Sequence, residues 1–150
     1  MRFLMDAYKV LLGEILIQRK KITRSQLEEA LKTQRQQGGF IGETLVKLGF
    51  VEEREVVAAL VIQCGLPYIA VNKYAIDPQV TQLIPKEVAC KERVIALDRI
   101  GDILSVVMVN PLNEEKKNYL EALTKCRIAA FISSSTAIQE AIVRHYGGLQ

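Results

Sequence analysis

The sequence predicts an α+β protein: an N-terminal helical subdomain of two tandem helix-turn-helix repeats, packed on a small α/β subdomain with a short mixed sheet. A 24-residue stretch with helical spacing of apolar residues occurs twice in the first half. After Pro67 the spacing changes to short β-branched runs separated by helical stretches. The chain has 150 residues, 49% of them hydrophobic, which is enough for a core without disulfides. We therefore expect two domains, residues 1–66 and 67–150.

The repeat is the strongest of these observations. Leu11–Gln34 (copy one) aligns with Phe40–Gln63 (copy two) at an offset of 29 residues, with identity at six of 24 positions. Amphipathic helices match by chance at apolar positions. A shared glycine at the third position and a shared glutamine at the last cannot come from apolar periodicity, so we interpret the pair as a true duplication.

Copy one contains clear helix-boundary residues. Thr23 and Gln26 have the spacing of a capping box, which places the start of the second helix of this copy at Thr23. Gly38-Gly39 is expected to end that helix. Between these limits four residues are expected to share one face of the helix: Leu27, Ala30, Leu31 and Gln34.

Copy two follows the same plan. Its first helix is predicted over Phe40–Leu48, with Gly49 as a left-handed C-terminal cap. The second helix is predicted over Glu53–Cys64. Gly65-Leu66-Pro67 ends it, because proline cannot continue the hydrogen-bond ladder.

The second half alternates strands and helices. It is predicted to begin with a strand over Tyr68–Val71 and a short helix from Asp77-Pro78 to near Pro85. A hairpin of Arg93–Arg99 and Ile103–Val109, joined by Ile100-Gly101-Asp102, follows. After the turn Asn110-Pro111 we expect a helix over Asn113–Thr124, a strand over Arg127–Ile132, and a last helix that is capped by Ser135 or Thr136 and ends at Gly147.

The charge balance gives little support to a nucleic-acid binder. The net charge is +3, far below that of most proteins that track phosphates. All of the excess lies in residues 1–75, with 11 Lys and Arg against 8 Asp and Glu. Arg19-Lys20-Lys21 and Arg24 account for much of it. This cluster is either a solvated turn or an electrostatic patch for an acidic partner or phosphates.

No catalytic, metal or membrane-spanning pattern is present in the sequence. His145 is the one histidine, and no nucleophile is spaced to use it. Neither a Walker motif nor GxGxxG occurs, so we expect no enzyme activity in this chain, no catalytic residues, no metal and no bound cofactor. The cysteines Cys64, Cys90 and Cys126 are too scattered for a clip or a zinc knuckle and are typical of free thiols in a reducing compartment.

The motifs as a set resemble a known family. The copies LLGEILIQRKKITRSQLEEALKTQ and FIGETLVKLGFVEEREVVAALVIQ are similar to the tandem motif RLGxxLVxxGxxxxxxLxxxLxxQ of the MshEN family, with the family's five-residue spacer at Arg35–Gly39. The segments LIPKEVACKERVIAL, VVMVNPLNEEKKNYLEAL and AIVRHYGG resemble the rest of the N-terminal domain of type II secretion and type IV pilus assembly ATPases of the GspE/PilB kind.

This resemblance implies a regulatory and docking module that precedes a hexameric motor and binds a cytoplasmic adaptor at the inner membrane. It also implies a cytoplasmic location, peripheral to that membrane through partners. The chain is then either the leading part of such an ATPase or a stand-alone copy.

Some family members bind cyclic di-GMP along the two motifs, so a second-messenger receptor is the alternative function. By resemblance the ligand contacts are Leu12, Gly13, Leu16, Ile17, Leu27, Leu31 and Gln34 in copy one, and Ile41, Gly42, Leu45, Val46, Gly49, Val56, Leu60 and Gln63 in copy two. The chain departs from the motif at three positions. Leu11 and Phe40 replace its leading arginines, and Lys20 replaces a glycine in copy one. Phe40 could still stack on a base, and charge could come from other cations: Arg2, Lys9 or Arg35.

Overall fold

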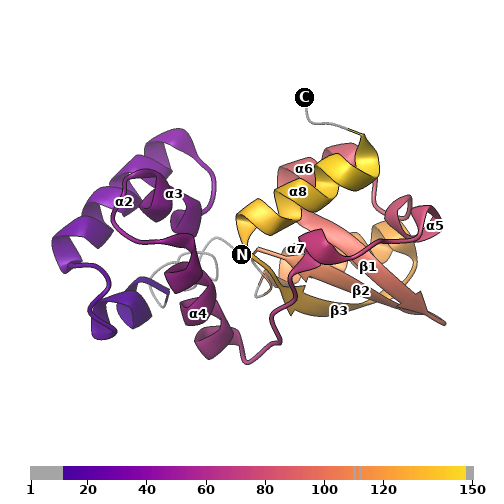
Figure 1. Cartoon of the computed structure of the whole chain (residues 1–150), viewed down its shortest axis with the longest axis horizontal. Helices are drawn as coiled ribbons and strands as arrows, with labels where there is room; N and C mark the ends of the chain where they lie inside the picture. Colours follow the sequence, from indigo (N-terminus) through magenta and orange to yellow (C-terminus); the bar gives the residue numbers. More distant parts are fainter. Residues whose placement is uncertain (1–11, 110, 112, 148–150) are drawn as a thin grey trace. The chain divides into compact units, whose positions relative to one another are not determined.

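The structure, a computed structural model, describes residues 12–109, 111 and 113–147 (Figure 1). The chain divides into two compact units, Met1–Gly65 and Leu66–Gln150, one residue before the predicted boundary. The first unit is helical in its described part and the second combines helices with a mixed sheet, so the predicted α+β class is confirmed. Leu11, Arg2, Lys9 and Asn110 lie outside the described residues.

The helical unit contains the two repeat copies. Residues 12–18 are helical, followed by α2 (Arg24–Gln37), α3 (Ile41–Lys47) and α4 (Glu53–Cys64). Its largest fully buried side chains are Leu12, Leu16, Ile41 and Leu45. These residues lie at equivalent positions of the two copies, so each copy contributes the same face to the core of the unit.

Local capping sets the helix ends as predicted. Thr23 Oγ1 accepts a hydrogen bond from Gln26 N at 3.1 Å, and Gln26 Oε1 accepts one from Thr23 N at 2.9 Å, completing the capping box. Gly38, with a φ of 76°, ends α2. Gly65 is the left-handed cap of α4, with a φ of 64°.

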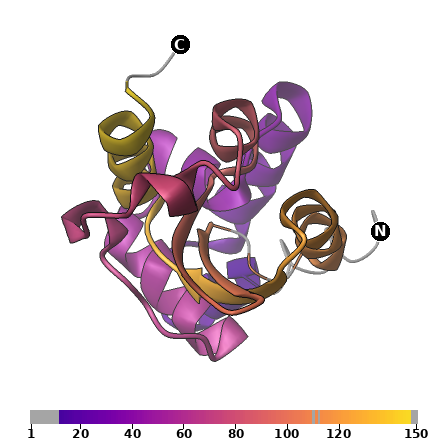
Figure 2. The ribbon, with the colours of Figure 1, turned by 90° about the vertical axis from the view of Figure 1, so that its right-hand side faces the viewer.

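The α/β unit carries the remaining elements. In chain order they are the 3₁₀ helix η1 (Val71–Lys73), α5 (Pro78–Thr81), α6 (Lys86–Glu92), β1 (Val94–Ile100), β2 (Ile103–Met108), α7 (Glu114–Thr124), β3 (Arg127–Ile132) and α8 (Ser135–Tyr146). The strand order is β1-β2-β3, with β1 antiparallel and β3 parallel to β2, as a mixed sheet requires. α7 and α8 lie on opposite sides of this sheet (Figure 2).

Three predictions for this unit are wrong in detail. Tyr68–Val71 is no strand: Tyr68 makes a single parallel bridge to Ile132, and Val71 N turns back to Ile69 O at 2.9 Å. The helix predicted from Asp77-Pro78 to near Pro85 ends at Thr81, and α6 is not predicted, because its seven residues, between Pro85 and the left-handed Arg93, are too few for a periodic pattern. The last helix is capped by Ser134 rather than by Ser135 or Thr136, because Ser134 Oγ accepts from Ala137 N at 3.0 Å.

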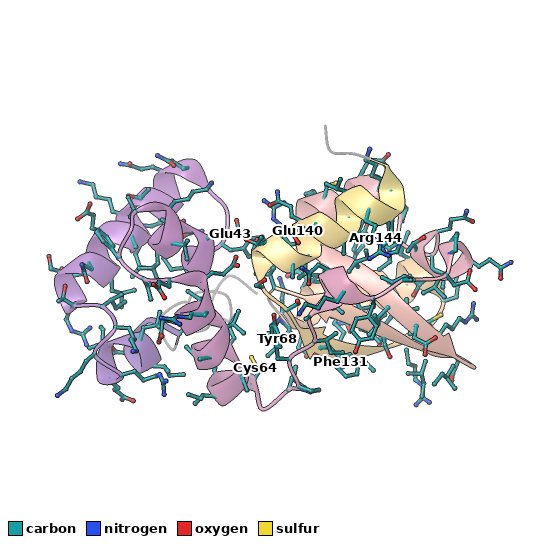
Figure 3. All side chains as sticks on the ribbon, in the orientation of Figure 1. Glu43, Cys64, Tyr68, Phe131, Glu140 and Arg144 are labelled. Atoms are coloured by element: carbon teal, nitrogen blue, oxygen red, sulfur yellow. The ribbon has the colours of Figure 1, made fainter. Side chains whose placement is uncertain are left out.

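The C-terminal helix α8 holds the chain that enters this unit. Asn72 Nδ2 donates to Glu140 Oε1 at 2.8 Å, and Glu140 and Arg144 both project from α8 (Figure 3). Tyr146 donates its hydroxyl hydrogen towards two carbonyl oxygens, 2.8 Å from Thr81 O and 2.6 Å from Ile84 O. Burial, aided by Cys90, raises the pKa of Tyr146 to about 12, so the phenol stays a donor at physiological pH.

Candidate functional site

The motif glycines lie where helices approach closely in both copies. A Cβ on Gly13 would lie 2.5 Å from Leu27 Cδ2, and one on Gly42 would lie 2.8 Å from Val56 Cγ1. Leu27 and Val56 are themselves separated by the repeat offset of 29 residues. The duplicated sequence thus repeats the same contact, and both glycines serve helix packing.

The turns after the first helices are also equivalent. In copy one, Lys20 N donates to Ile17 O and Lys21 N to Leu16 O, both at 2.9 Å. In copy two, Gly49 N donates to Val46 O at 3.0 Å and Phe50 N to Leu45 O at 3.1 Å. These are two Schellman motifs in register.

The central residue of each turn is left-handed. In copy two it is Gly49, with a φ of 78°, and in copy one it is Lys20, with a φ of 61°. The lysine that replaces the motif glycine therefore keeps the turn but adopts a backbone conformation that side chains disfavour.

The motif glutamines differ between the copies. Gln34 Nε2 donates to Gly39 O at 2.9 Å, while its Oε1 is buried without a partner. In Gln63 both amide atoms are buried without a partner. The residue equivalent to Gly39 is Tyr68, which joins the sheet of the α/β unit at Ile132 instead of turning back. Within the described part of the chain, no carbonyl oxygen accepts from the Gln63 amide as Gly39 O accepts from Gln34.

Burial divides the fifteen residues predicted to contact a ligand. Gly49 is exposed, and four are part-exposed: Ile17, Leu31, Val46 and Gln63. Ten are buried: Leu12, Gly13, Leu16, Leu27, Gln34, Ile41, Gly42, Leu45, Val56 and Leu60. The buried members form the packing between helices of the unit, so the surface available to a ligand comes from the first five.

The leading motif positions carry no cation. Copy two begins with Phe40, which is the part-buried N-cap residue of α3 and makes no side-chain capping bond there. Leu11 of copy one lies outside the described residues. Stacking by an arginine on a guanine base is therefore unavailable at the position where copy two has Phe40.

The basic cluster in the turn of copy one is partly neutralised within the helical unit. Arg24 Nη2 contacts both carboxylate oxygens of Glu14, at 2.9 and 2.8 Å, and this hydrogen bond and charge raise the pKa of Arg24. Lys21 Nζ lies 3.3 Å from a carboxylate oxygen of Glu55. Among the described residues of the cluster, Lys21 and Arg24 are in ion pairs within the unit and Arg19 and Lys20 are in none, which favours a solvated turn over a phosphate-binding patch.

Other candidate residues have structural surroundings. His145 Nε2 lies 3.3 Å from Tyr74 O, in the last turn of α8. Cys126 is buried, whereas Cys64 and Cys90 are only part-buried, and none of the three forms a disulfide. Within the described ranges no three His, Cys, Asp or Glu side chains gather as metal ligands. In the same ranges no helix is both long and apolar enough to span a membrane.

Known proteins show the same arrangement. The N-terminal domain of XpsE has a TM-score of 0.77 at 16% identity, covering 92% of this chain and 95% of that one, which shows a shared fold. The structure described as MshE with cdg, the abbreviation of cyclic di-GMP, has a TM-score of 0.71 at 27% identity and covers 90% of this chain and 98% of that one. The chain thus has the fold of the N-terminal domain of XpsE and of the MshE structure.

The family follows from the sequence comparisons. A family model, the MshEN domain, matches residues 64–150, and the chain belongs to this family. Type IV pilus assembly ATPase PilB of Myxococcus xanthus is 37% identical over 135 residues, which is 90% of this chain and 24% of that protein. PilB of Thermus thermophilus is 29% identical over 137 residues, covering 90% and 15%. The chain spans a quarter or less of these curated relatives. The family match begins at Cys64, so it covers the α/β unit and hardly touches the repeat.

Proposed function

We propose that this chain is a non-catalytic regulatory and docking domain of a type IV pilus or type II secretion ATPase, and that its helical unit binds cyclic di-GMP. The observation that carries the ligand proposal is the Gln63 amide, whose two polar atoms are buried and have no hydrogen-bond partner among the described residues. Such a group costs about 1–3 kcal/mol. A guanine edge offers a donor beside an acceptor and would satisfy both atoms.

The relatives support the same ligand. MshE, which shares the fold of this chain at 27% identity, has been solved with cyclic di-GMP. The part-exposed aliphatic residues Ile17, Leu31 and Val46 can cover base and ribose faces. Gly49 leaves backbone accessible beside them.

Calorimetric titration with cyclic di-GMP tests the proposal. We expect saturable binding to the wild-type chain. Gln63→Leu should lower the affinity by about tenfold or more, since one hydrogen bond is worth about 1.4 kcal/mol. Gln34→Leu should change the affinity by less than about threefold, because its amide already bonds to Gly39. Phe40→Arg restores the motif cation and should tighten binding by about tenfold. A flat titration at concentrations well above micromolar contradicts the proposal.

Docking to a cytoplasmic adaptor is the second function, and it is favoured by the exposed apolar side chains of the α/β unit. Tyr119 and Leu123 are 49% and 37% exposed on α7, although large apolar residues are usually covered. A pull-down with the cytoplasmic domain of the adaptor from the same secretion or pilus machine should recover this chain. Recovery that persists after all exposed apolar side chains of the α/β unit are replaced by serine contradicts this assignment.

A further inference from the structure

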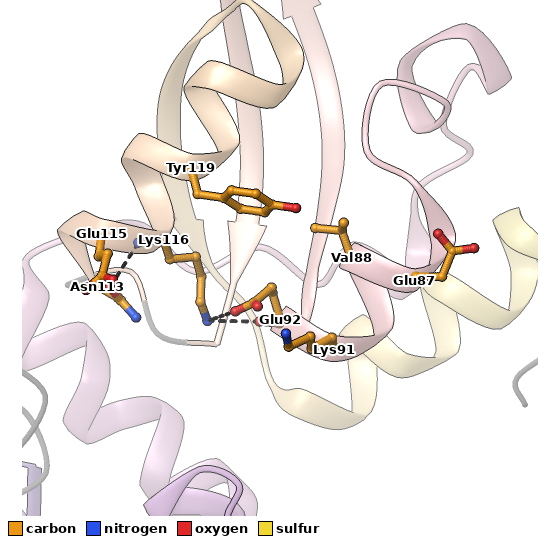
Figure 4. Close-up of a pocket in the computed structure, with 8 residues that line it drawn as sticks. All are labelled: Glu87, Val88, Lys91, Glu92, Asn113, Glu115, Lys116 and Tyr119. Carbon is orange, nitrogen blue, oxygen red and sulfur yellow. Dashed lines mark hydrogen bonds and ion pairs between the residues drawn. The ribbon is translucent and has the colours of Figure 1, made fainter. Parts of the chain in front are cut away.

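The α/β unit has an open pocket between α6 and the first turns of α7 (Figure 4). Its volume is about 630 Å³, which falls in the range of pockets that receive a ligand or an anchoring side chain. It lies wholly within one unit, and it is distinct from the repeat that carries the proposed nucleotide site. The sequence does not predict this pocket, because α6 is too short to give a periodic pattern.

The pocket contains an ion pair between the buried Lys116 and the part-exposed Glu92. The Lys116 side chain is 4% exposed, and its Nζ lies 3.0 Å from Glu92 O and 3.5 Å from Glu92 Oε1. Burial lowers the pKa of Lys116, and Glu92 opposes that effect. Because this ammonium group is already bonded to α6, it holds the two helices together and does not attract an anion from solution.

Among mostly charged and polar lining residues, the pocket has two apolar or aromatic side chains. Val88 of α6 faces the ring of Tyr119 of α7 across the opening (Figure 4). Tyr119 is 49% exposed, and Leu123, one turn further along α7, is 37% exposed. Side chains four residues apart share a helix face, so an apolar strip leads out of the pocket along α7.

The rim of the pocket favours a cation. Lys116 and Glu92 offset each other, which leaves the carboxylates of Glu87 and Glu115 against the one ammonium group of Lys91. No hydrogen bond or ion pair joins either carboxylate side chain to another residue in the described part of the chain. A guanidinium group combines charge with a flat face, so it can stack on Tyr119 and pair with Glu115, which lies four residues before Tyr119 on α7.

We propose that the α6–α7 pocket is the docking site for a protein segment that inserts an arginine side chain next to an aliphatic residue. The arginine lies over the Tyr119 ring and pairs with Glu115, Glu87 adds negative charge at the α6 end of the pocket, and the aliphatic residue covers Leu123. This inference rests on the proposed docking function and gives it a surface and a partner chemistry. Aromatic anchors in pockets contribute most of the energy of such interfaces.

The first test uses a probe that does not depend on an adaptor. Acetyl-Leu-Arg-Leu-amide, titrated into the ¹⁵N-labelled chain, should shift the amide signals of Val88 and Tyr119 saturably. The matched peptides with glutamine or glutamate in place of arginine should bind at least about tenfold more weakly. Saturable shifts confined to other regions, or equal binding of the glutamate peptide, would overturn the proposal.

The second test uses variants and the adaptor's cytoplasmic domain. Tyr119→Ala and Glu115→Lys should each lower the affinity for both the peptide and the adaptor by about tenfold or more. Tyr74→Ala is the matched control, because Tyr74 is 48% exposed in the same unit but outside the pocket, and it should change affinity less than about twofold. Equal losses in Tyr119→Ala and Tyr74→Ala contradict the pocket. Peptide binding at the pocket without any adaptor binding would refute the docking function while leaving the pocket's arginine chemistry intact.

Discussion

In copy one of the repeat, the last glutamine donates to the carbonyl of Gly39; in copy two, the equivalent amide of Gln63 has no partner at either atom. The packing of the copies is otherwise alike, because the same glycine meets the same second-helix position in each, Gly13 at Leu27 and Gly42 at Val56. Duplication has thus preserved the apolar contacts and changed the polar ones.

This difference has a physical origin in the connection that follows each copy. Each copy must bury its own apolar face, so glycine contacts and Schellman turns are needed twice. The carbonyl that serves Gln34 belongs to the five-residue spacer, and copy two is followed by chain that joins the sheet at Ile132. In the described part of the chain, the two copies thus have equivalent apolar cores, while their last glutamines differ in hydrogen bonding.

The largest expected effect breaks the shared packing. Gly42→Ala places a Cβ 2.8 Å from Val56 Cγ1, and we expect a loss of about 2 kcal/mol in unfolding free energy despite the better helix propensity of alanine. Gly13→Ala should cost less, since the Leu27 atoms it meets are the ends of a more flexible side chain. Urea denaturation measures both. Adding Val56→Ala to Gly42→Ala should recover part of the loss, and full additivity of the two changes would show that the contact is not the cause.

The glutamines are expected to respond in opposite directions. Gln34→Leu removes a hydrogen bond to Gly39 O and should lower stability by about 1–2 kcal/mol. Gln63→Leu removes two unpaired buried atoms and should leave stability unchanged or raise it by about 1 kcal/mol. Thermal and urea unfolding without nucleotide provide the measurement. Equal destabilisation by the two changes would mean that Gln63 is paired in solution, and the contrast between the copies would be lost.

Substitutions at the left-handed residue of each turn are expected to change stability less, and in opposite directions. Lys20→Gly relieves a left-handed lysine at a φ of 61° and should raise stability by about 0.5 kcal/mol, after the entropy cost of glycine. Gly49→Lys should lower it by about 1 kcal/mol. If Lys20→Gly and Gly49→Lys both have wild-type stability, the two turns do not share a Schellman geometry in solution.

Local signals in the sequence account for most of the fold. The capping box at Thr23, the left-handed Gly49 and the limits of α4 depend on residues a few positions apart, and all were predicted correctly. The prediction failed where distant residues decide. The segment Tyr68–Val71 has residue types that favour a strand. In the structure Tyr68 forms an isolated bridge to Ile132, and the chain turns directly after that bridge.

The members of the candidate site remain a prediction from the family resemblance, and the sequence does not predict which of them are exposed. The family motif identifies the glutamines by position, yet only the course of the chain after Pro67 leaves the amide of Gln63 unpaired. The buried Lys116 had a usable signal, because it lies four residues before Leu120 on the buried face of α7. A lysine at a core position of an amphipathic helix indicates a buried polar contact, here with Glu92.

The smallest expected effect concerns the ion pair of copy one. Arg24→Ala removes a two-oxygen contact with Glu14 that is open to solvent, so its stabilisation depends on ionic strength. We expect a small decrease in melting temperature relative to wild type at low salt, and none at about 1 M NaCl, where the Debye length is about 3 Å. Lys47→Ala, an exposed lysine in the last turn of α3, is the control and should change little at either salt concentration. A decrease in Arg24→Ala that high salt does not reduce would assign the contribution to packing of the arginine side chain instead of its charge.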